Sequence, residues 1–181
     1  MDRERDSQRS KVYAAERAAW AELIKLRPEL DVTYTKADAI RELRALAERK
    51  RITTNYPRAL WLAKVEVTIS NRGGSCYPGW TPRIRLGSWA RTRHFVILHE
   101  AAHQLQSRES SAHGWEFCDA HLALWRARYG VDAAKVLEHH YKAAKVRYRK
   151  PRAKKVLTPD QKAVLSERLA VARAAKLGKG A

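Results

Sequence analysis

The sequence is poor in cysteine and has no long apolar run, and both features exclude whole classes of protein. Its two cysteines, Cys76 and Cys118, are too few for the disulfide framework of a small secreted protein. No apolar stretch approaches the roughly 20 residues that a membrane-spanning helix needs. Residues 1–11 are charged and lack the apolar centre of a secretory signal. We therefore expect a cytoplasmic protein without a membrane partner.

Acidic residues are also scarce, with 19 of them against 37 lysines and arginines in a chain of 181 residues of net charge +18. Residues 141–181 alone contain 13 basic and two acidic side chains. The densest basic block comprises Lys142, Lys145, Arg147, Arg149, Lys150, Arg152, Lys154 and Lys155. Such a block can neutralise phosphates, so one predicted partner is nucleic acid bound without sequence preference. The alternative is a solvated tail that serves solubility.

The pentapeptide His99-Glu100-Ala101-Ala102-His103 has the pattern H-E-x-x-H. On a helix its two histidines lie one turn apart on the same face, where both can bind one Zn²⁺. Glu100 lies beside them and can accept a proton from a zinc-bound water. No proline or glycine interrupts residues 91–106, so the motif can be helical. The apolar residues Phe95, Leu98, Ala102 and Leu105 recur at helical spacing and predict a buried stripe. The alternative is a buried helix with two incidental histidines.

Catalytic zinc has three protein ligands and one open position, so a third ligand is expected. His113 is the first candidate, because it follows the polar segment 106–112 and precedes a predicted helix over residues 114–129 that ends at Gly130. The rival ligands are Glu116, Asp119 and His121. Either acid can instead support the first turns of that helix or orient a ligating histidine. His121 can equally be a core residue.

Together these segments resemble the SprT-like zinc metallopeptidases of the zincin superfamily. The resemblance is closer to a family of short metallohydrolases of bacteria and phages, in which a strand precedes the H-E-x-x-H helix and an H-G segment follows it. The matching segments here are Arg83-Ile84-Arg85-Leu86, the pentapeptide and His113-Gly114, within about residues 60–130. The resemblance implies that His99, His103 and His113 bind Zn²⁺ and that Glu100 is catalytic.

The sequence predicts an α+β fold: a small zincin-like domain whose short sheet packs on the active-site helix, with further helices at both ends. Helices are expected over residues 12–26 and 36–51, the second behind a capping box of Thr35 and Asp38. Strands are expected over 65–69 and 83–86. We divide the chain into a helical segment (1–58), a metal-binding core (59–131) and a basic helical arm (132–181).

Other features of the sequence concern the substrate and the arm. Either strand can serve as an edge that binds an extended peptide. The loop 71–80 then flanks the cleft, or it is an ordinary hairpin connection. Pro151 is expected to separate two helices, the second of which starts at Thr158-Pro159.

The predicted function is a zinc-dependent metallohydrolase, specifically a peptidase that acts on protein or peptide, with Glu100 as general base. The alternative is a basic nucleic-acid-binding module whose zinc is structural or whose catalysis is lost. An electrophilic group should also stabilise the oxyanion. The chemically suitable candidates are Tyr129, Tyr141, His139 and His140, which the sequence does not place.

Overall fold

The computed structural model describes residues 6–70, 75–76, 82–87, 93–107, 110–151 and 158–177, with the backbone alone for 75–76 and 172–177. The chain divides into two units, Met1–Lys150 and Pro151–Ala181. The helices are α1 (Arg9–Leu26), α2 (Lys36–Ala47), α3 (Lys50–Asn55), α4 (His94–Leu105), α5 (Trp115–Tyr129), α6 (Val131–Ala143) and α7 (Pro159–Leu177). Short 3-10 helices are η1 (Pro28–Leu30) and η2 (Ala59–Lys64), and the strands are β1 (Glu66–Ser70), β2 (Ser75–Cys76) and β3 (Arg83–Gly87).

The strands form one small mixed sheet in the order β1-β3-β2. β1 runs parallel to β3, with Val67 opposite Ile84, and β2 is antiparallel to β3. The interpretation of the loop 71–80 as an ordinary hairpin connection is therefore wrong, because a hairpin joins two antiparallel strands that are neighbours in the sheet. Among the described strands β3 is central and β1 lies at an edge, so of the two predicted strands only β1 remains a candidate edge for peptide binding. The segment 71–80 lies outside the described residues except for the backbone of β2.

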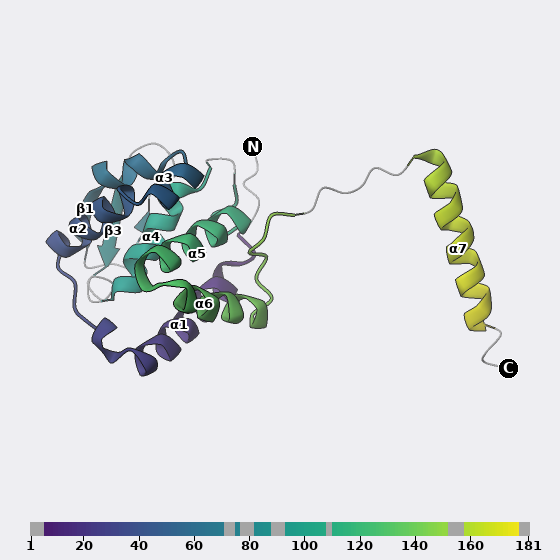
Figure 1. The fold of residues 1–181 in the computed structure, drawn as a ribbon, viewed down its shortest axis with the longest axis horizontal. Helices are drawn as coiled ribbons and strands as arrows, with labels where there is room; N and C mark the ends of the chain where they lie inside the picture. Colours follow the sequence, from purple (N-terminus) through teal and green to yellow (C-terminus); the bar gives the residue numbers. More distant parts are fainter. Residues whose placement is uncertain are drawn as a thin grey trace. The chain divides into compact units, whose positions relative to one another are not determined.

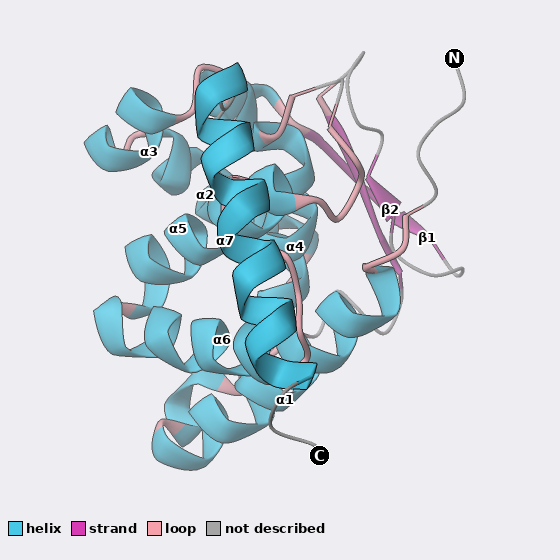
Figure 2. Cartoon of the chain, turned by 90° about the vertical axis from the view of Figure 1, so that its right-hand side faces the viewer, coloured by secondary structure: helices cyan, strands magenta, loops and turns pink. Residues whose placement is uncertain are grey.

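Helix α4 is the centre of the first unit, because all twelve of its residues are buried. Figure 1 shows α4 beside α5, with α6 and α1 following on the side away from the strands. Figure 2 shows the strands gathered at one side, where α2 and α4 contact them. The predicted apolar stripe of α4 is confirmed, since Phe95, Leu98, Ala102 and Leu105 are at most 4% exposed. The mixed helix-and-strand class is confirmed too.

Local sequence explains most helix ends. The predicted capping box is present at α2, where the Thr35 hydroxyl accepts from the Asp38 amide and the Asp38 carboxylate accepts from the Thr35 amide. α5 ends at Gly130, whose φ of +97° favours glycine.

The helix predicted over 36–51 is in fact two helices, because Arg49 has an extended backbone that separates α2 from α3. This break lets Ile52 of α3 become fully buried.

The C-terminal part also follows the prediction in outline. Pro151 lies between α6 and α7, although α6 already ends at Ala143. α7 begins at Pro159, and the Thr158 hydroxyl accepts from the Gln161 amide at 3.3 Å. Across the part of the chain that the structure describes, no helix combines the length and apolar character needed to cross a bilayer.

Candidate metal centre

Three histidines predicted to bind a metal lie together inside the first unit. One ring nitrogen each from His99, His103 and His113 falls in a group whose members lie within 4.8 Å of one another. His99 Nε2 and His113 Nε2 are only 3.3 Å apart. All three side chains are buried, and His103 is the most exposed at 8%. The structure therefore brings two residues of α4 together with a residue of the turn that precedes α5.

The local fold explains this meeting. His99 and His103 are one turn apart on α4 and point to the same side. His113 precedes α5 in a tight turn, in which the Gly114 amide donates to the Ser111 carbonyl at 2.9 Å. A Cβ on Gly114 would lie 3.2 Å from that carbonyl oxygen, closer than most side chains allow. The glycine of the H-G pair thus permits the turn that directs His113 toward α4.

Carboxylates hold the outer nitrogen of two of these rings. Glu16 Oε2 lies 3.0 Å from His99 Nδ1, and Asp6 Oδ2 lies 2.5 Å from His113 Nδ1. An imidazole that donates from Nδ1 carries its lone pair on Nε2. The two Nε2 atoms face each other at 3.3 Å, a distance at which they can share a proton or bind one cation. Two nitrogens bound to one tetrahedral Zn²⁺ are about 3.3 Å apart, as follows from Zn–N bonds of about 2.05 Å.

The charges around the site favour a cation. Burial raises the pKa of Glu16, but His99 and His121 outweigh it and lower the pKa to about 2, so this carboxylate is ionised. Burial and the neighbouring imidazoles hold the pKa of His103 well below its ordinary value. Burial also lowers the pKa of His113. These shifts favour the neutral imidazoles of His103 and His113 that a metal requires. Burial also acts to lower the pKa of His99, but Glu16 outweighs it and raises that pKa above its ordinary value.

Glu100 follows His99 on α4 and is 5% exposed. Burial raises its pKa to about 7, and the Glu16 charge acts in the same direction. A carboxyl group with a pKa near 7 can both accept and release a proton at neutral pH. The arrangement can therefore support proton transfer beside the three histidines.

The rival ligands are occupied elsewhere. The Glu116 carboxylate accepts from the Ser107 amide at 2.9 Å, where it holds the segment after α4. The Asp119 carboxylate accepts from the Tyr56 hydroxyl at 2.7 Å. His121 is completely buried, and its ring nitrogens contact Tyr141 and Trp125. None of the three belongs to the histidine cluster found in the described residues.

The electrophile candidates from the sequence also have other partners. The Tyr129 hydroxyl lies 2.6 Å from His94 Nδ1, and the Tyr141 hydroxyl lies 2.7 Å from His121 Nδ1. His140 Nε2 lies 2.8 Å from Glu22, and its neighbour His139 is exposed.

Sequence reasoning did not find the site residues of α1. The Tyr13 ring stacks on His99 with centroids 5.0 Å apart and meets the His113 ring edge-on at 5.3 Å. The Arg9 guanidinium lies 5.5 Å from the centre of the Tyr13 ring. One signal for Glu16 was available, because this acid shares the helical face of Tyr13, Trp20 and Leu23.

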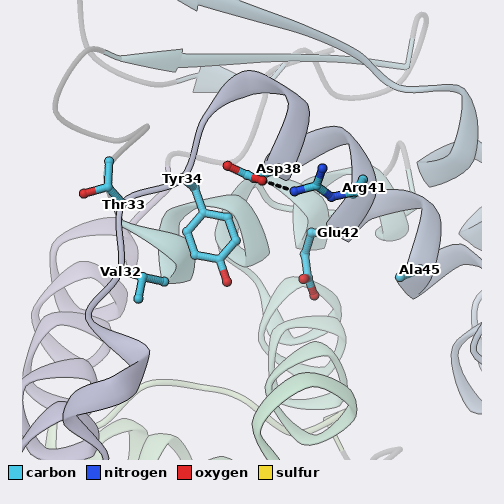
Figure 3. A pocket seen from close by; sticks show the side chains of 7 residues that line it. All are labelled: Val32, Thr33, Tyr34, Asp38, Arg41, Glu42 and Ala45. Carbon is cyan, nitrogen blue, oxygen red and sulfur yellow. Dashed lines mark hydrogen bonds and ion pairs between the residues drawn. The ribbon is translucent and has the colours of Figure 1, made fainter.

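A shallow hollow of about 400 Å³ lies elsewhere, at the start of α2. Figure 3 shows Tyr34 and Glu42 on the same side of this helix, beside the ion pair of Asp38 and Arg41. Its lining residues are Val32, Thr33, Tyr34, Asp38, Arg41, Glu42 and Ala45, which include none of the three histidines. We assign no chemistry to it.

Comparison of the chain with family models, with curated proteins and with solved structures finds no match.

Proposed function

We propose that the protein is a zinc-dependent metallohydrolase that cleaves peptide bonds. In this proposal His99, His103 and His113 hold the metal and Glu100 is the general base. One observation carries it: the Nε2 atoms of His99 and His113 converge to 3.3 Å while carboxylates hold the opposite ring nitrogens. The resemblance of the H-E-x-x-H and H-G segments to SprT-like peptidases supports the reaction class.

Three protein ligands, as found among the described residues, favour a catalytic site over a structural one, because structural zinc has four. When bound, Zn²⁺ would supply a water of lowered pKa and polarise the substrate carbonyl. The Glu100 carboxylate accepts the proton of the attacking water and returns it to the leaving amine. Its burial excludes bulk water from this transfer.

In the same proposal, residues of α1 stabilise the negative charge that develops on the substrate. Attack on a carbonyl places negative charge on its oxygen, and a nearby donor stabilises that charge. Tyr13 packs against two of the histidines and is itself in contact with Arg9. We assign the oxyanion contact to the Tyr13 hydroxyl, with the Arg9 charge in support.

Metal content and peptide cleavage test the proposal when measured for the parent and for Glu100→Gln. We expect one zinc per chain in both, and cleavage lowered about 10²–10⁴-fold in the variant. Glu116→Gln is the control, because Glu116 bonds the Ser107 amide instead of the cluster. A parent chain without stoichiometric metal would overturn the proposal. A metal-loaded parent that cleaves no peptide or protein would favour a structural zinc module.

A second activity has its own support, in the basic residues in the last turn of α6 and directly after this helix. Lys142, Lys145, Arg147, Arg149 and Lys150 are all exposed. We propose that they bind nucleic acid through its phosphates. Replacing all five by glutamine should weaken DNA binding and make the salt dependence shallower by about 0.9 in log–log slope per lost phosphate contact. An unchanged slope would remove this second proposal.

A further inference from the structure

Glu16 is the one charged residue among those of α1 that are buried, at 2% exposure. Its carboxylate reaches two rings: Oε2 lies 3.0 Å from His99 Nδ1, and Oε1 lies 3.2 Å from His121 Nε2. Burying an ionised carboxylate is costly unless it is paired. An apolar residue at this position of α1 would avoid the free-energy cost of burying a charge. The acid at position 16 therefore indicates a function beyond packing.

The second partner of Glu16 is fixed from two further sides. His121 Nδ1 lies 2.7 Å from the Tyr141 hydroxyl, and His121 Nε2, the nitrogen that faces Glu16, also lies 2.9 Å from Trp125 Nε1. His121, Trp125 and Tyr141 are all fully buried. A chain of contacts therefore runs from α6 through α5 to α1 and ends on His99 of α4. Such a chain restricts both the position of the Glu16 carboxylate and the orientation of the His99 ring.

We propose that Glu16 is a positioning residue that sets the metal affinity of the centre through His99. The inference rests on the proposed function only in assuming that the histidines bind a metal. Glu16 holds the His99 proton at Nδ1, which leaves Nε2 free to ligate, and its negative charge favours a cation at this ring. Asp6 has the equivalent contact with His113. Two carboxylates near the N-terminus thus support a centre whose proposed ligands come from α4 and from the turn before α5.

The test is the Zn²⁺ affinity of Glu16→Gln, measured by competition with a chromophoric chelator. Glutamine keeps the size and an oxygen for the His99 contact but removes the charge. We expect the affinity to fall about 10–100-fold. Glu22→Gln is the matched control, because Glu22 lies on the same helix and pairs with the surface residue His140 at 2.8 Å. Equal affinities of Glu16→Gln and the parent would overturn the proposal.

A second measurement needs no variant. Histidine ¹⁵N spectra of the zinc-loaded parent should show His99 with its proton on Nδ1 and the metal on Nε2. A proton on Nε2 would overturn the proposal even if Glu16→Gln fails to fold. The outcomes are distinct from those for the proposed function. A parent that binds no zinc defeats the proposed function, whereas a parent that binds zinc with Glu16→Gln unaffected defeats this proposal alone.

Discussion

The first turn and the middle of α4 carry histidines with similar surroundings but different geometry. His99 stacks on Tyr13 with centroids 5.0 Å apart and is bound by Glu16. His94, at the first turn of α4, stacks on Tyr34 at 4.4 Å, and its Nε2 lies 3.5 Å from a Glu42 oxygen. Both rings are buried, and each pairs a tyrosine face with a glutamate.

The difference lies in what faces the second ring nitrogen. His94 Nδ1 lies 2.6 Å from the Tyr129 hydroxyl, which can donate or accept and so satisfies it within the protein. His99 Nε2 lies 3.3 Å from another imidazole nitrogen, an arrangement suited to a shared cation. The second ring nitrogen therefore separates the two histidines: the Tyr129 hydroxyl satisfies it in His94, whereas in His99 it faces a second imidazole.

Among the tests of this comparison, the largest effect is expected from removing the Tyr13 hydroxyl. Tyr13→Phe should lower the rate of peptide cleavage about 10²-fold, the usual cost of one lost oxyanion donor. Tyr34→Phe should leave the rate unchanged and lower the free energy of unfolding by about 1 kcal/mol, because the Tyr34 hydroxyl accepts from Arg128 at 3.3 Å. Steady-state kinetics and urea unfolding of both variants check this. Equal loss of activity in the two variants would remove the assigned role of Tyr13.

The next effect is stabilisation by metal. Free zinc at a hundredfold excess over its Kd should raise the free energy of unfolding by about 2.7 kcal/mol. For a chain of this size that corresponds to a Tm rise of about 5–11 °C. His103→Gln should abolish most of the rise, whereas His94→Gln should keep it. Differential scanning calorimetry with and without zinc measures the Tm shifts. A Tm rise that is lost in His94→Gln and kept in His103→Gln would contradict the proposed ligand set.

How much of this the sequence could predict depends on the range of the interactions. The spacing of His99 and His103, the glycine after His113 and the apolar stripe of α4 are local, and the structure has the expected helix and turn. The partners of the histidines are not local, since Glu16 is 83 positions from His99 and Asp6 is 107 positions from His113. The helical periodicity identifies Glu16 as an acid on an apolar face, but it does not show which histidine ring the Glu16 carboxylate contacts.

The same limit applies to the fold. The alternation of apolar and polar residues predicted both strands, but it carries no information on strand direction. The parallel pairing of β1 with β3 was therefore not predicted. The break between α2 and α3 falls at Arg49, where no glycine or proline marks it. Burial of Ile52 accompanies that break, and burial depends on the assembled core rather than on neighbouring residues.

The smallest effect expected is a pH dependence at the His94 end. Burial raises the pKa of Glu42, but His94 and Arg128 outweigh it and lower the pKa below its ordinary value. Glu42 faces both groups, with Arg128 Nε at 2.9 Å and His94 in turn beside Tyr129. A carboxyl group whose pKa is lowered by folding stabilises the protein above its unfolded pKa, and the contribution disappears as the pH falls through the folded pKa.

Glu42→Gln should therefore cost about 1.5 kcal/mol of unfolding free energy at pH 6, and the difference from the parent should shrink below about pH 4.5. Urea unfolding of both proteins between pH 6 and pH 3 measures this difference. Glu48→Gln is the control, because Glu48 is an exposed acid at the end of the same helix and should change the free energy by less than about 0.5 kcal/mol. If the Glu42→Gln difference stays constant from pH 6 to pH 3, the His94 cluster does not depend on the Glu42 charge. Zinc affinity should be the same in parent and Glu42→Gln, because the ion pairs of Glu42 are with His94 and Arg128 and not with the proposed metal ligands.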